Sequence, residues 1–179
     1  MREKVLETMK MLGFVLTPVL NYHLFRFEGK GYLLYLDDDD DQFLSIVIPN
    51  LMDAESDDEE EHDDMFMEML RVEAEVNAKI KYVKALIQDE SLWLSYEREV
   101  VDEEDFEDLL PKMIFHLFKA SEFVRNQVLK AQLAEDCSSK DYESSEECLV
   151  SDCSDDEFDE LNGSYDAEII GGLEQNRNK

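Results

Sequence analysis

Residues 101–134 read VDEEDFEDLLPKMIFHLFKASEFVRNQVLKAQLA, and this stretch decides the fold. Its apolar residues recur at steps of three and four, which is the spacing of one helix face. Asp102 stands where an N-cap belongs, and the acidic residues that follow it suit the positive end of the helix dipole. Because Pro111 cannot donate a hydrogen bond to the carbonyl of Glu107, we expect either a kink or a second helix beginning near Pro111. The apolar face consists of Phe106, Leu109, Leu110, Met113, Ile114, Leu117, Phe118, Val124 and Val128.

The segments before this helix are expected to cover its apolar side. Helices are predicted at residues 2–12 and at about 64–77, the second capped by Asp63 or Asp64. Strand patterns of alternating side chains occur at 19–28, 32–36, 42–48, 79–88 and 92–101. Pro49 is expected to end the third of these strands. The order α-β-β-β-α-β-β-α predicts an α+β fold, with helices packed on an antiparallel sheet of about five strands.

The formal net charge of -29 is unevenly distributed along the 179 residues. Residues 37–41 contain five acids, and residues 53–64 contain nine acids and no base. The length predicts one domain over residues 1–134, followed by a tail over 135–179 that carries 15 acids and 3 bases. This tail is too polar to bury much surface, so we expect disorder from about residue 136. Such a charge argues against binding nucleic acid or an anionic membrane, but it permits a basic protein partner.

The chain has no apolar run near the roughly 20 residues that a membrane helix needs. The best candidate, residues 11–20, is short and contains Gly13 and Pro18. Glu3 and Glu7 lie near the N-terminus, where no small-residue cleavage site follows, so we expect no signal peptide. A cytoplasmic location is the resulting prediction.

Side chains that could perform chemistry do not form a known motif. As an EF-hand loop, residues 37–41 would need Gly at position 42 and Glu at position 48, but the chain has Gln42 and Ile48. His62 lies among carboxylates without a second histidine at helical spacing, and the other two histidines are expected to be structural. The three cysteines lie in the tail, and zinc would need a fourth ligand. The sequence therefore predicts no catalytic, cofactor-binding or metal-binding residue.

Aromatic side chains give a better indication of function. They occur on both sides of the first strand, and Trp93 lies on the last strand. If helices cover only one face of the sheet, part of this surface is exposed, and an exposed apolar patch usually marks an interface. The predicted partner-binding residues are Phe25, Phe27, Tyr32 and Trp93. Ordinary core and cross-strand packing is the alternative interpretation of the same residues.

One continuous run, together with the order of elements, resembles a known family. A helix ends near Asn77 and is followed by KIKYVKALI, the acidic turn QDES, LWLSYERE, and the helix DFEDLLPKMIFHLFKASEFV. Over about residues 1–132, this pattern resembles the YbjN-like family and the wider type III secretion chaperone-like fold. The resemblance implies a small α+β domain, often dimeric, that acts by binding other proteins as a chaperone or a regulator. The resemblance implies no active-site residues.

These observations favour a non-enzymatic binding module, and the family resemblance implies that it forms a homodimer. It would hold a partner protein on its sheet surface, while the acidic segments steer basic partners. Two alternatives remain. One is an acidic regulator that responds to divalent cations, and the other is an acidic mimic of nucleic acid that occupies a basic protein.

Overall fold

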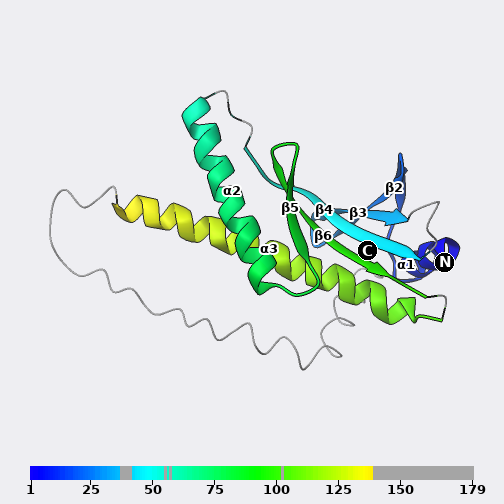
Figure 1. Cartoon of the computed structure of the whole chain (residues 1–179). Helices are drawn as coiled ribbons and strands as arrows, with labels where there is room; N and C mark the ends of the chain where they lie inside the picture. Colours follow the sequence, from blue (N-terminus) through cyan, green and yellow to red (C-terminus); the bar gives the residue numbers. More distant parts are fainter. Residues whose placement is uncertain (37–41, 55, 57, 102, 139–179) are drawn as a thin grey trace. The chain divides into compact units, whose positions relative to one another are not determined.

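The computed structural model describes residues 1–36, 42–54, 56, 58–101 and 103–138, and for residues 132–138 it describes the backbone alone. The chain divides into two compact units, residues 1–124 and 125–179. The described residues form three helices and six strands (Figure 1). In chain order these are α1 (Arg2–Met11), β1 (Thr17–Val19), β2 (Tyr22–Phe27), β3 (Lys30–Leu36), β4 (Phe43–Asp53), α2 (Glu59–Lys79), β5 (Lys84–Gln88), β6 (Ser91–Glu99) and α3 (Phe106–Ser138).

The six strands form one sheet in the order β1-β2-β3-β4-β6-β5, and every neighbouring pair is antiparallel. The predicted α+β fold with an antiparallel sheet is therefore confirmed. The sixth strand, β1, lies almost wholly before the segment predicted as a strand at 19–28, and it forms a hairpin with β2. Leu20 adopts a left-handed conformation (φ 50°), so the chain reverses between β1 and β2. No helix in the described part of the chain is long and apolar enough to cross a bilayer.

One face of the sheet and the helices enclose the core. Along β3, β4 and β6, the buried apolar side chains alternate with partly exposed ones, as expected for a sheet covered on one side. Two ring contacts join this face to α3, from Phe27 to Phe118 at 5.9 Å and from Tyr96 to His116 at 6.1 Å between centroids. The helical stripe predicted for α3 supplies buried residues up to Val124: Phe106, Leu109, Leu110, Met113, Ile114, Leu117 and Val124.

Several predicted boundaries are wrong. Pro49 does not end β4, which continues to Asp53 past an irregularity in its pairing with β6 between Ile48 and Met52. A proline is tolerated where the ladder is already interrupted. The helix α2 begins earlier than predicted, because the carboxylate of Asp58 accepts hydrogen bonds from the backbone N–H groups of the first turn. The strand β5 begins only at Lys84.

The long helix also differs from its prediction at its start. Asp102 lies outside the described residues, and the carboxylate of Asp105 caps α3 by accepting from the backbone N–H of Glu107 at 3.0 Å. No second helix begins at Pro111, which lies inside α3. The proline costs the helix one hydrogen bond, while the buried stripe on both sides of it holds the helix against the sheet. The predicted disorder of the tail and the acidic segment at 37–41 lie outside the described residues.

Candidate functional site: the open face of the sheet

The register of the strands defines a second face of the sheet, opposite the one that packs against the helices. The side chains of this face pair across the strands, as in Leu33 with Val47 and Leu86 with Trp93. We call this surface the open face. Its apolar members are all partly exposed, whereas most of their neighbours on the covered face are buried. The apolar side chains of the open face are those of Tyr22, Leu24, Leu33, Tyr35, Phe43, Val47, Leu86 and Trp93.

Aromatic rings form a row across three strands of the open face. The ring centroids of Tyr22 and Tyr35 lie 5.4 Å apart, and those of Tyr35 and Phe43 lie 6.1 Å apart. Cross-strand aromatic pairs of this kind stabilise a sheet. The same rings supply large, rigid contact area, which protein interfaces favour. The row is therefore suited to contact with another apolar surface.

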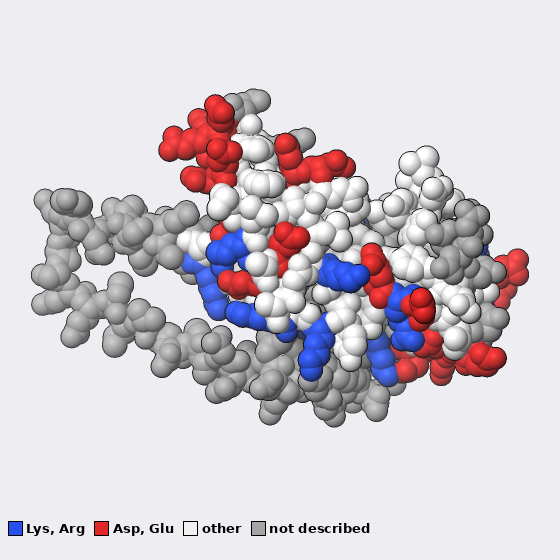
Figure 2. All heavy atoms as spheres, viewed as in Figure 1, with Lys and Arg blue, Asp and Glu red and all other residues white. Residues whose placement is uncertain are grey.

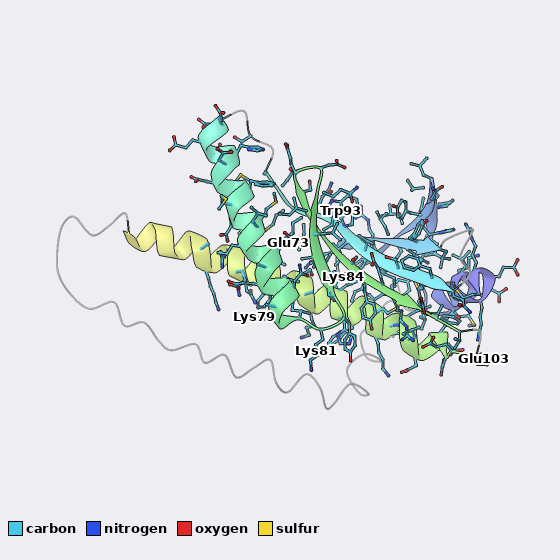
Figure 3. The ribbon with its side chains drawn as sticks, in the orientation of Figure 1. Glu73, Lys79, Lys81, Lys84, Trp93 and Glu103 are labelled. Carbon is cyan, nitrogen blue, oxygen red and sulfur yellow. The ribbon has the colours of Figure 1, made fainter. Side chains whose placement is uncertain are left out.

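Small polar side chains lie beneath these large ones. Ser45 and Ser95 are only 3% and 2% exposed, although they belong to the open face. The hydroxyl of Ser95 and the indole N–H of Trp93 have no hydrogen-bond partner among the described residues. Buried polar groups are normally hydrogen-bonded. Both atoms are covered by their neighbours, so they lie under the open face and not on its surface. Figure 3 labels Trp93 on β6 and Lys84 on the neighbouring strand β5.

The edges of the sheet are less suited to binding than its face. On β5, the side-chain amide of Asn77 donates to the carbonyl oxygen of Ala85 at 3.0 Å, and its oxygen accepts from the Ala85 N–H at 2.9 Å. Asn77 thus takes the place of a neighbouring strand at this position. The other edge strand, β1, has three residues and contains Pro18. Short edges and prolines hinder the addition of another strand.

The four predicted partner-binding residues do not lie together. Phe25 and Tyr32 stack in the core at 5.2 Å, with exposures of 1% and 0%. Burial raises the pKa of the Tyr32 hydroxyl. Phe27 is partly exposed, but it lies on the covered face against Phe118. Trp93 lies on the open face. The prediction therefore needs correction for Phe25 and Tyr32, because side chains this deeply buried cannot reach a partner.

The sequence did contain a signal for the residues that the prediction missed. Tyr22 and Leu24 share one side of their strand, opposite Phe25 and Phe27, so both sides are apolar. An apolar side chain that faces away from the helices is as available to a partner as the side chain of Trp93. The choice between the two sides depends on where the helices pack, and strand alternation does not contain that information.

Burial shifts the pKa of two histidines near the covered face. Burial lowers the pKa of His116, which lies against Tyr82 and Tyr96. Burial also lowers the pKa of His23, with a further contribution from the positive charges of Arg2 and Lys10. His62 stacks on Phe66. Within the described residues, no three His, Cys, Asp or Glu side chains are grouped as metal ligands.

Comparisons with known proteins bear on the fold alone. No known protein family matches the sequence, and no curated protein matches it. An uncharacterized protein from Methanothermobacter thermautotrophicus has a similar structure, with a TM-score of 0.53 and 12% identity over 73% of this chain and 97% of that chain. YbjN from E. coli, described as a proposed transcription regulator, has a TM-score of 0.44 and 12% identity over 75% of this chain and 93% of that chain. The second score is too low to support an argument.

Proposed function

We propose that the chain is a non-enzymatic protein-binding module that holds a partner protein on the open face. The observation that carries this proposal is a row of partly exposed aromatic and aliphatic side chains on the sheet face opposite the helices. Contiguous apolar surface of this kind is typical of interaction sites. Asn77 and Pro18 obstruct the two edges, which favours binding across the face over the addition of a strand.

The chemistry of the face indicates the kind of partner. The row of Tyr22, Tyr35 and Phe43 suits apolar side chains. An apolar protein segment meets this requirement. The negative charge of the chain would speed the approach of a partner with basic flanks, while the contact on the face sets the dissociation rate.

A substitution at the centre of the open face tests this function. In Leu33→Gln, an amide replaces an apolar side chain that pairs with Val47, so a bound apolar segment would have to desolvate it. We expect the affinity for the partner to fall by about tenfold at high salt, with little change in thermal unfolding. The measurement is the retention of co-purifying protein on immobilised full-length chain, followed by titration with the purified partner.

Leu20→Gln is the matched control, because Leu20 is 96% exposed and lies in the β1–β2 turn. It makes the same chemical change outside the open face, and we expect it to leave the affinity unchanged. Equal affinity for wild type and Leu33→Gln would contradict the proposal. A second copy of this chain is another protein that could occupy the face, and sedimentation equilibrium would reveal it as a dimer that Leu33→Gln dissociates.

A further inference from the structure

Several positively charged side chains lie around the end of α2 on this acidic chain (Figure 2). The first turn of α2 contains Glu59, Glu60 and Glu61. In contrast, residues 77–88 contain three lysines and no acid. Figure 2 shows acidic side chains over one end of α2 and lysine and arginine side chains around its other end and the start of β5. Acidic and basic side chains thus lie at opposite ends of α2. Solubility alone would not require this separation of charge.

Three elements bring the basic side chains together. The ammonium group of Lys79, at the end of α2, lies 5.8 Å from the ring centroid of Phe123 in α3. Lys119, one turn before Phe123, lies 5.3 Å from the ring of Phe115. Between α2 and β5, Lys81 continues the surface, and Figure 3 labels it near Lys79. We call Lys79, Lys81 and Lys119 the lysine cluster. Lys84 is not part of it, because Lys84 pairs with Ser95 on the open face.

Two members of the lysine cluster have uncompensated charge. The third member, Lys79, forms an ion pair with Glu75 at 3.7 Å. An exposed pair like this is weak and exchanges readily with other anions. Lys81 and Lys119 are exposed and have no ion pair with any described residue. Both can therefore accept a carboxylate from another molecule without first breaking an ion pair.

Tyr82 adds an exposed aromatic ring next to Lys81. Its side chain is 64% exposed, and its backbone has a φ of 69°, a conformation that non-glycine residues seldom adopt. The ring stacks on Tyr96 at 6.0 Å and contacts His116 at 5.6 Å. The fold thus holds an exposed ring in a strained segment between lysines, an arrangement that is common at binding sites.

We propose that the lysine cluster and Tyr82 form a docking surface for a short acidic protein segment. Carboxylates of the segment would meet Lys81 and Lys119, and an apolar or aromatic side chain among them would pack on Tyr82. Nucleic acid fits less well, because a net charge of -29 repels a long polyanion. A short segment with a few carboxylates meets the lysines while avoiding most of that repulsion. This surface is separate from the open face, so it can act independently of the function proposed above.

Peptide binding to the full-length chain tests this proposal. The probe is a fluorescent peptide rich in Asp and Glu with one Tyr, and the matched peptide carries Asn and Gln at the acidic positions. At about 50 mM salt we expect the acidic peptide alone to bind, and binding to weaken as screening increases. Lys81→Glu should weaken it by about tenfold, since it replaces an attraction with a repulsion. Tyr82→Ser should weaken it as well.

Lys10→Glu is the control, because it changes the net charge equally at an exposed lysine of α1. It should leave peptide affinity within about twofold of wild type, as should Leu33→Gln on the open face. Equal weakening by Lys81→Glu and Lys10→Glu would reduce the effect to net charge and overturn the proposal. It would also be overturned by the absence of binding at low salt, or by tighter binding of a single-stranded oligonucleotide or of vesicles containing anionic lipid.

Discussion

Leu117→Ala is expected to lower the free energy of unfolding by roughly 2–5 kcal/mol, the usual cost of truncating a fully buried leucine. Leu117 is 0% exposed and lies on the stripe of α3 that packs against the covered face. Its loss would leave a cavity in the core and remove apolar burial at the same time. Urea denaturation followed by circular dichroism measures the change through the midpoint and the slope.

Leu129→Ala provides a control within the same helix. Leu129 is 48% exposed, so the same truncation there should change the free energy of unfolding by no more than about 0.5 kcal/mol. Similar losses at the two positions would mean that helical propensity, not packing on the sheet, determines the contribution of α3. That result would contradict the description of α3 as the helix that completes the core.

Phe25→Ala and Trp93→Ala are expected to have opposite effects. Phe25 is 1% exposed and stacks on Tyr32, so its truncation should cost roughly 3–5 kcal/mol of stability. Trp93 is partly exposed on the open face, and its indole N–H has no partner among the described residues. Its truncation should cost less stability but reduce partner affinity by about tenfold or more, as at an aromatic hot spot.

Two measurements on each variant separate these effects. Denaturation gives stability, and titration of the partner under conditions where the variant is fully folded gives affinity. Trp93→Phe retains most of the apolar area and should lose less affinity than Trp93→Ala. If folded Phe25→Ala lost affinity while Trp93→Ala kept it, the covered face rather than the open face would be the binding surface.

The helical face of α3 was predictable because it depends on local spacing. Leu110, Met113 and Leu117 recur at helical intervals, and any helix with that pattern must bury one stripe. The order of strands and helices followed from similar periodicity and turn residues. The cap of α2 was less predictable, since nine of the twelve residues from 53 to 64 are acidic and several of them could cap a helix.

The binding surface was less accessible to sequence reasoning than the fold. Phe25 and Tyr22 belong to the same strand and have similar character, yet the helices cover only the side that contains Phe25. That difference is tertiary, because it depends on which face α3 meets. The lysine cluster was missed for the same reason. Lys79 and Lys119 are 40 positions apart, and only the packing of α2 beside α3, where Lys79 lies over Phe123, brings them onto neighbouring helices.

Site-specific photo-crosslinking from the open face tests the binding function most directly. A benzophenone amino acid would replace Leu33 on the face or Leu20 in the β1–β2 turn, and each full-length protein would be irradiated in native lysate at high salt. We expect a discrete adduct from position 33 that is absent from position 20 and is lost when Trp93→Ala is added. Adducts of equal yield from both positions, or from position 20 alone, would contradict binding on the open face.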